Sequence, residues 1–235
     1  MQRFSTIALA CLIALPTFAQ DVPPAKPTDA DAKIKTDAYN QAVKDKSDEG
    51  KKAAIDAMSD CPHANVLNLL ARILVGDTDE CRTAAAKTLG RMKGELGAAK
   101  ALHGALKANE ERSSVLTACF TAIGDINHPS SVAVCEDWVN HRLGSRDGED
   151  LPGVNQAVDA LGALKWKSSV EALIDLWHKN RVVGRDPASK FREKVRKHCS
   201  QALSRLVGEK VGNQDAWDDW WKDNKGKFND DLTSK

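Results

Sequence analysis

The chain has 235 residues, of which 42% are hydrophobic and 29% charged, a composition typical of one or two soluble domains and too polar for several membrane spans. Only 5% of the residues are aromatic and there is a single tyrosine, which disfavours an all-β sandwich. Beyond residue 19 the chain has 33 basic and 33 acidic residues, and this balance does not favour a nucleic-acid binder, which normally has a basic excess.

Residues 1–19 have the pattern of a secretory signal peptide. Arg3 precedes a nearly uncharged apolar stretch, residues 4–18, and Thr17 and Ala19 are the small residues expected three back and one back from a cut after Ala19. We therefore expect the protein to be exported to the periplasm or secreted.

Two other readings of this leader stay open. A membrane anchor needs about 20 apolar residues, and Pro16 interrupts these. A lipoprotein cleavage box could end at Cys11, although the apolar stretch continues beyond that cysteine. Because cleavage removes this apolar stretch, we expect no membrane span in the mature chain.

Residues 20–50 are rich in charge, alanine and proline and contain few large apolar groups. Such a segment cannot bury much surface, so we expect it to be partly disordered. We predict a tether to about residue 30 and then a short helix from Asp31 to Val43, with Tyr39 and Val43 as its only anchor.

Residues 51–228 contain an internal repeat that predicts the fold class. Five large apolar anchor residues recur at spacings that grow along the chain: Met58, Leu89, Ile123, Leu161 and Leu203. Each anchor has small residues four positions and one position before it. This pattern describes one helix per repeat whose small side chains let its neighbour approach closely. Between these helices lies a second set of apolar stripes, of which Val66, Leu69 and Ile73 are one. We therefore predict an all-α solenoid of about four to five helical hairpins.

The stretch from Asp79 to Gly90 resembles the D-x-x-V-R-x-x-A-A-x-A-L-G signature of HEAT repeats, especially the short subtype of bacterial HEAT proteins and phycobilin lyases. Residues 194–203 and 154–162 resemble it more weakly. The resemblance implies a HEAT-like solenoid and says little about function. The activities of HEAT-repeat enzymes are not implied, because the chain has no His-Glu dipeptide like those of the di-iron members and the lyases act on cytoplasmic chromoproteins.

The end of the chain is rich in tryptophan, as in exported bacterial HEAT proteins. Trp217, Trp220 and Trp221 lie on one face of a last helix, at positions i, i+3 and i+4. We expect them to cap the open end of the solenoid, with an aromatic ligand platform as the alternative. Residues 229–235 are expected to be a disordered tail.

No catalytic, cofactor or metal motif is present in the sequence. The six histidines stand singly, and the closest approaches to a metal pair are Cys61 with His63 and His198 with Cys199. We therefore expect no catalytic residue, no cofactor and no metal, while noting that curvature of a solenoid can bring distant His and Cys side chains together.

Two loops lengthen as the repeat spacing grows, residues 143–153 and 183–190, and both connect equivalent helices. Insertions in a solenoid map to one face, which is often the binding face. Arg146, Asp147, Arg185 and Asp186 are therefore the predicted protein-binding residues, with tolerated surface growth as the alternative.

Five cysteines lie beyond the leader, an odd number without a C-x-x-C pair, so at least one thiol is expected to be free. Cys119 and Cys135 each lie eight residues from Asn127, at the expected turn between two antiparallel helices. They could form a disulfide, but facing helices usually stand too far apart, so free thiols are expected.

These features together predict a monomeric, non-catalytic scaffold of the periplasm or cell envelope that binds a protein partner. An enzyme or a metal-binding accessory protein that uses His and Cys residues gathered by the solenoid is the alternative, and a purely structural envelope protein is a third possibility.

Overall fold

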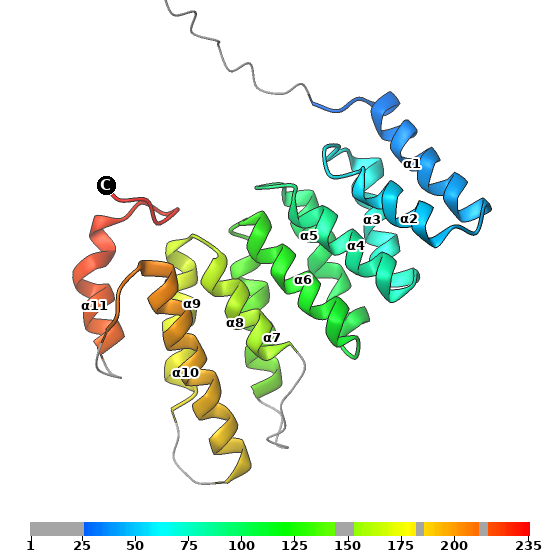
Figure 1. Cartoon of the computed structure of the whole chain (residues 1–235). Coiled ribbons are helices and arrows are strands. Elements are labelled where there is room, and N and C mark those ends of the chain that lie inside the picture. The colour runs from blue at the N-terminus through cyan, green and yellow to red at the C-terminus, as the bar shows by residue number, and fades with distance from the viewer. Residues whose placement is uncertain (1–25, 144–152, 182–185, 212–215) are drawn as a thin grey trace, which may run out of the picture.

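The computed structural model describes residues 26–143, 153–181, 186–211 and 216–235. Within these ranges the chain forms eleven α-helices, two short 3₁₀-helices and no strand (Figure 1). The helices are α1 Asp29–Lys44, α2 Asp48–Asp56, α3 Ala64–Gly76, α4 Asp79–Gly90, α5 Leu96–Ala105, α6 Ser113–Ile126, α7 Ser131–Leu143, α8 Val154–Ala163, α9 Lys167–Lys179, α10 Pro187–Val207 and α11 Ala216–Asn224. The predicted all-α class is confirmed.

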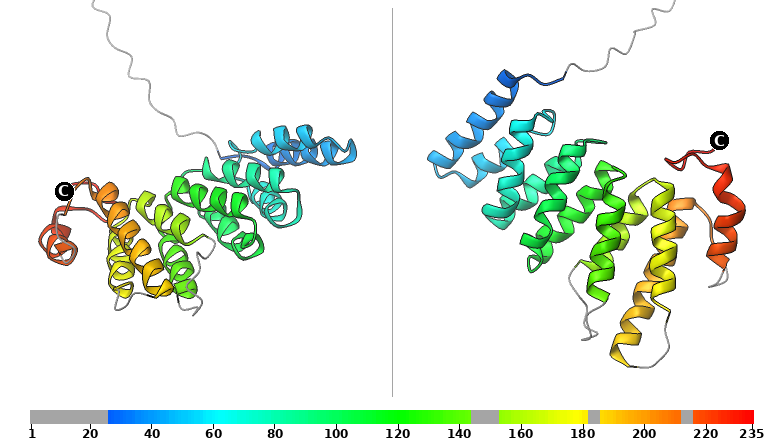
Figure 2. Two further views of the ribbon diagram at one scale, coloured as in Figure 1. Left: turned by 60° about the horizontal axis from the view of Figure 1, so that its bottom comes forward. Right: turned by 180° about the vertical axis from the view of Figure 1, so that it is seen from behind.

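The first ten helices form five antiparallel hairpins that stack in chain order (Figures 1 and 2). The second helices of the hairpins, α2, α4, α6, α8 and α10, contact one another along one side and form a layer that we call the inner layer. The first helices, α1, α3, α5, α7 and α9, form the outer layer, in which α5 and α7 touch only slightly. A stack curves toward the layer with the closer packing. The chain is therefore an α-solenoid with its even-numbered helices on the inside of the curve.

Glycines and alanines set the close packing of the inner layer. A Cβ atom added to Gly162 would lie 2.9 Å from the Cβ of Ala202, and one added to Gly124 would lie 2.9 Å from the Cβ of Ala163. Gly90 faces Ala122 in the same way, at 3.1 Å. Contacts this short leave no room for a larger side chain, so the small residues of the repeat fix the distance between successive inner helices.

The apolar columns read from the sequence form the core. All five anchor residues are fully buried, as are the small residues Ala85, Cys119, Ala157 and Cys199 four positions before four of them. The stripes of the outer layer are buried on the other side of the same core, for example Val66, Leu69 and Ile73 of α3. One continuous core between two helix layers stabilises the solenoid.

The N-terminal hairpin differs from the expectation in both extent and anchoring. Helix α1 starts at Asp29, where Thr28 closes a capping box with Asp31, so the stack begins well before residue 51. Ala32, Tyr39 and Ala42 are its buried residues, and the helix packs against α2 of its own hairpin and α3 of the second. Val43 is 47% exposed, so its predicted role as an anchor is wrong, because the helix is rotated so that Ala42 faces the core.

Buried polar groups connect the first three hairpins. The hydroxyl of Tyr39 and the ammonium of Lys51 both donate to the carboxylate of Asp77, which follows α3. Arg82 donates to the carbonyl of Asp77 at 2.7 Å and to Oδ1 of Asn109 at 2.9 Å. Because these groups bond to one another, the network links adjacent hairpins at little cost for burying polar side chains.

The C-terminal residues fold back on the last hairpin. Trp217 and Trp221 are buried, and their indole Nε1 atoms donate to Ser200 of α10 at 3.1 Å and to Glu171 of α9 at 3.4 Å. Residues 229–235 differ from the expected disordered tail, since Phe228 pairs with Ser234 and the carbonyl of Asp230 accepts from the backbone N–H of Lys167. These contacts arise only when α9 is in place, so the local sequence does not reveal them.

All five described cysteines are buried free thiols. Burial raises the pKa of Cys119, Cys135 and Cys199 to about 12, so these thiols stay protonated at neutral pH. They pack as small apolar residues, as the sequence suggested for Cys119 and Cys199. No helix of the described ranges is long and apolar enough to cross a membrane.

Candidate interaction surface

Several repeats together build the exposed side of the inner layer. Its α6 stripe consists of Ser114, Thr117, Thr121 and Asp125, spaced three, four and four residues apart so that they share one face of the helix. The neighbouring helices continue this surface with Thr83 and Lys87 of α4 and with Asn155, Gln156 and Asp159 of α8. Most of these side chains are polar and short, so the surface offers hydrogen-bonding groups in place of a large apolar patch.

Charged residues on this surface follow a register between successive helices. In each inner helix, the residue two positions before the anchor (Met58, Leu89, Ile123 or Leu161) faces a residue of the next inner helix, the one two positions after that helix's anchor. Asp56 pairs with Arg91 in this way, and Asp159 pairs with Arg205 at 2.6 Å. These contacts tie α2 to α4 and α8 to α10. As partly exposed ion pairs they add little stability, but they fix which charges the inner surface shows.

A groove of about 280 Å³ lies between α4 and α6 on this surface. Lys87 and Asp125 occupy the same register positions here as the ion pairs and line the groove together. Its other lining residues are small or hydroxyl-bearing, among them Thr83, Ser114 and Thr117. A groove with hydroxyl groups along its wall and one charge of each sign can hold an extended polar segment, and it holds no set of groups for acid–base catalysis.

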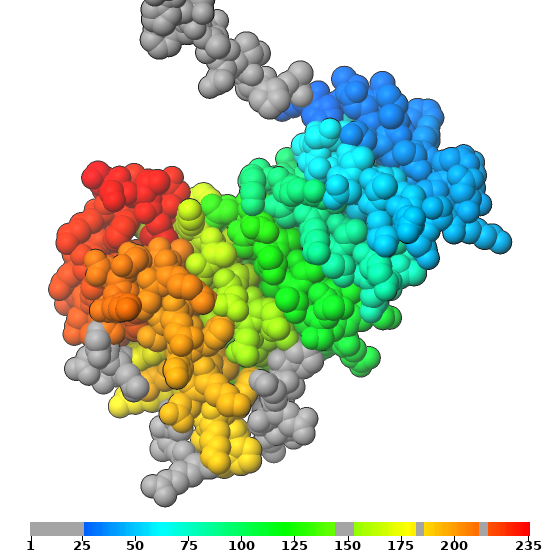
Figure 3. Space-filling model, viewed as in Figure 1, coloured from blue at the N-terminus to red at the C-terminus, as the bar shows by residue number. Residues whose placement is uncertain are grey.

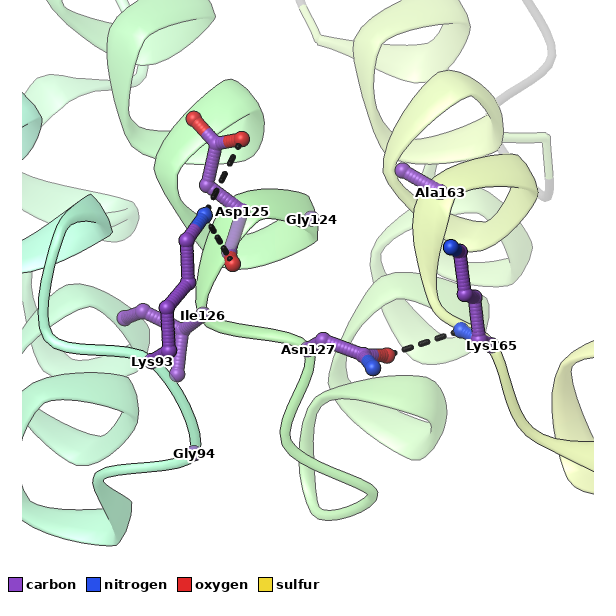
Figure 4. Close-up of a pocket in the computed structure, with 8 residues that line it drawn as sticks. All are labelled: Lys93, Gly94, Gly124, Asp125, Ile126, Asn127, Ala163 and Lys165. Atoms are coloured by element: carbon purple, nitrogen blue, oxygen red, sulfur yellow. Dashed lines mark hydrogen bonds and ion pairs between the residues drawn. The ribbon is translucent and has the colours of Figure 1, made fainter. Parts of the chain in front are cut away.

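A second depression, of about 610 Å³, lies where the inner helices end (Figure 4). The ammonium of Lys93 donates to the carbonyl of Asp125 at 2.6 Å and lies 3.6 Å from its carboxylate. Asn127, at a φ of 55° that suits asparagine, accepts from the backbone N–H of Lys165 at 2.8 Å. The polar groups here mostly hold turns of neighbouring hairpins together, so the depression is chiefly structural.

Helix α10 carries the strongest charge imbalance of the described chain. Between Pro187 and Val207 it has six basic residues and one acidic residue, Glu193. Lys190, Lys194 and Lys197 are exposed, and none of the three pairs with a carboxylate in the described ranges. The inner surface therefore becomes positive at its C-terminal end, although the whole chain is nearly neutral.

The outer layer has a groove of opposite charge between α7 and α9. Its lining includes Glu136, Glu171 and Asp175. Burial and a hydrogen bond to Asp175 raise the pKa of Glu136, while Lys179 contacts both carboxylates and opposes this. Because Lys179 contacts both Glu136 and Asp175, and Glu171 accepts from Trp221, these groups link α7 to α9 and α9 to α11.

The predicted loop residues lie mostly outside the described chain. Arg146, Asp147 and Arg185 fall in residues 144–152 and 182–185. Asp186 is the N-cap of α10, where its carboxylate accepts from the backbone N–H of Ser189 at 2.8 Å and from its hydroxyl at 2.7 Å. The backbone hydrogen bond lowers the pKa of Asp186, as expected for a capping carboxylate. The helix ends that flank both loops lie at the same edge of the solenoid (Figure 1).

The two suspected metal pairs have other contacts. His63 is the N-cap of α3, accepting from the backbone N–H of Asn65 at 3.3 Å, and Cys61 is buried beside it. His198 lies 3.0 Å from Asp159, and Cys199 points into the core. Among the described residues no three His, Cys, Asp or Glu side chains are grouped as a metal would require.

The positions that reasoning from the sequence missed are the facing register positions and the lysine row of α10. The sequence does contain a signal for the facing register positions. Asp56 and Asp159 both precede their anchors by two residues, and Arg91 and Arg205 both follow theirs by two. The lysines were hidden by the neutral balance of the whole chain, which says nothing about where the charges lie. No family model matches the chain, and no curated protein is similar to it.

Proposed function

We propose that this protein is a non-catalytic scaffold of the periplasm or cell envelope that binds a protein partner on the exposed side of its inner layer. The observation that supports this proposal is the surface itself. Four neighbouring helices of the inner layer, α4, α6, α8 and α10, present one stretch of polar and charged side chains. The stacking of helical hairpins in a solenoid places these helices in a row, and the signal-peptide pattern of residues 1–19 supports export. Such a surface suits recognition by many small contacts.

Photo-cross-linking tests this proposal directly. A photoreactive amino acid replaces the exposed Thr117 on the inner layer, and as a matched control it replaces the exposed Asp137 on α7 of the outer layer. We expect a defined adduct from the Thr117 position in cells, which the Asp137 position does not give. The captured protein, once purified, is expected to bind the purified chain in solution. Adducts of equal yield from both positions, or none from either, would contradict the proposal.

Export is tested separately. Mass spectrometry of the native protein is expected to find a mature chain that begins at Gln20, in an extracytoplasmic fraction. A chain that keeps residues 1–19 in the cytoplasm would contradict the proposed location.

No observation on the described residues favours the alternative of a metal-binding or catalytic protein. Elemental analysis of the purified chain separates the two readings, because a stoichiometric transition metal would contradict a scaffold that needs none.

A further inference from the structure

The N-terminal half of α10 projects at one edge of the molecule (Figure 3). Lys190, Lys194 and Lys197 lie at i, i+4 and i+7 on this half, so at about 100° per residue they form one row along the helix. The row is about 10 Å long at 1.5 Å per residue. The buried residues Val195 and Cys199 lie on the opposite face, so the row points away from the core.

Neighbouring helices leave the row uncovered. On one side of it, His198 and Arg205 contact Asp159 of α8. On the other side, Ser200 accepts from Trp217 of α11. The row lies between these two contacts and opens onto the inner surface.

The charges of the row are available to a ligand. Arg205 is neutralised by Asp159, but no carboxylate of the described residues lies within ion-pair distance of Lys190, Lys194 or Lys197. Several other exposed charges on the inner layer are paired, among them Asp56 with Arg91 and Asp159 with Arg205. Unneutralised like charges held in one row repel one another, and an anionic partner removes that repulsion.

The surroundings of the row suit a polypeptide better than a membrane or a nucleic acid. Beside it α8 presents Asn155, whose amide can donate to and accept from a peptide backbone, and farther toward α6 the amide nitrogen of Gln156 donates to the hydroxyl of Thr117 at 3.5 Å. The large apolar side chains that are exposed in the described chain, Ile34, Val43, Val75 and Leu96, all lie in the first three hairpins, far along the stack from α10. A lipid-binding surface normally combines its cations with apolar side chains, and a nucleic-acid site needs a wider basic surface.

We propose that Lys190, Lys194 and Lys197 form the recognition site for an acidic, extended polypeptide segment that lies along α10 and continues across α8. This inference rests on the scaffold function proposed above and specifies the chemistry of its partner. The lysines supply long-range attraction and the orientation of the segment, and the amides and hydroxyls of α8 and α6 bind its backbone.

Fluorescence anisotropy with a synthetic probe tests the inference on the purified folded chain. The probe is a labelled peptide of about twelve residues in which glutamate alternates with serine, and the control peptide has glutamine in place of glutamate. We expect the glutamate peptide to bind with an affinity that falls as salt is raised, and the glutamine peptide to bind at least roughly tenfold more weakly.

Matched variants assign the binding to the row. The variant K190Q/K194Q/K197Q is expected to bind the glutamate peptide with an affinity roughly tenfold or more below that of the wild type. The control K44Q/K100Q/K225Q removes the same charge from exposed lysines outside the inner layer and is expected to change affinity by less than about threefold. The change R192Q removes one further cation of α10 that lies off the row, and it should resemble the control. Equal losses in both triple variants, or no binding of the glutamate peptide, would overturn the proposal.

Two other occupants are distinguished by the same reagents. If vesicles containing phosphatidylglycerol bind the wild-type chain but not K190Q/K194Q/K197Q, and the peptide does not bind, the row recognises a lipid surface and the proposal is wrong. The acidic residues Asp147, Glu149 and Asp150 precede α8 in sequence, so the variant D147N/E149Q/D150N is also measured. Unchanged peptide affinity supports the proposal, and a gain of roughly tenfold would show that this segment of the chain itself occupies the row.

The two experiments test the acidic segment and the scaffold function separately. A partner that cross-links from Thr117 and binds K190Q/K194Q/K197Q as tightly as the wild type would keep the scaffold and overturn the acidic segment. Failure of both experiments would overturn both.

Discussion

The change Gly162→Ala tests whether small residues set the spacing of the inner layer. The new Cβ would lie 2.9 Å from the Cβ of Ala202 and 3.3 Å from its Cα, so α8 and α10 must separate by a few tenths of an ångström. Forcing an extra methyl group into close packing costs about 1–3 kcal/mol. Against this, alanine is favoured over glycine in a helix by about 1 kcal/mol.

A matched control isolates the contact. Gly104 is the ninth of ten residues in α5, as Gly162 is in α8, but a Cβ added to Gly104 meets nothing within 4 Å. The change Gly104→Ala therefore gains helix propensity alone and should stabilise the chain by about 0.5–1 kcal/mol. Gly162→Ala should be less stable than Gly104→Ala by about 1–3 kcal/mol, the overpacking cost alone.

Urea denaturation followed by far-UV circular dichroism measures this difference. Equal stabilisation by both changes would show that α8 and α10 are not held at contact distance and would refute the packing argument. A double-mutant cycle sharpens this test. With Ala202→Gly in the background, the 2.9 Å contact between the two Cβ atoms is removed and only the 3.3 Å contact with the Cα of residue 202 remains, so most of the penalty of Gly162→Ala should disappear. A penalty that persists in that background would place its origin elsewhere in α8.

Three further outcomes follow from buried groups. The thiol of Cys135 should react with Ellman's reagent at pH 8 only after unfolding, because burial raises its pKa to about 12; rapid reaction of the native chain would contradict its placement. Burial, with a smaller repulsion from His128, lowers the pKa of His103 from 6.5 to about 4. The neutral His103 should therefore make its full contribution to the free energy of unfolding above pH 6.5, and this contribution should be lost as the pH falls toward 4. His103→Gln should flatten this pH dependence in thermal unfolding, and an unchanged slope would exclude His103 as its source. Trp217→Ala should lower the free energy of unfolding by about 3–5 kcal/mol because the indole is fully buried, and Trp220→Ala should lower it less because Trp220 is half-buried. Equal losses of stability in chemical denaturation would argue against α11 as a cap.

The class of fold and the composition of the core can be predicted from the amino-acid sequence alone. Anchors such as Leu89 and Leu161 recur with small residues at fixed offsets, and local periodicity reports this kind of packing because burial of one helix face repeats in every hairpin. The exposed and buried sides of α6 followed from the same period. The start of the stack did not, since α1 has few large apolar residues and is held by Ala32 and Ala42, whose size gives no signal.

Which side chains share a surface depends on how the helices pack against one another. Whether Asp159 meets Arg205 depends on the stagger of α8 against α10, a distance that no spacing within one helix encodes. Asp186, read from the sequence as a binding residue, is also the cap of α10 because the chain starts a helix there. The row of Lys190, Lys194 and Lys197 is visible in the sequence as a helical spacing, but only the packing of its neighbours shows that no carboxylate of the described residues pairs with it. Charge balance is a property of the whole chain, whereas recognition depends on the local field, and packing alone sets that field.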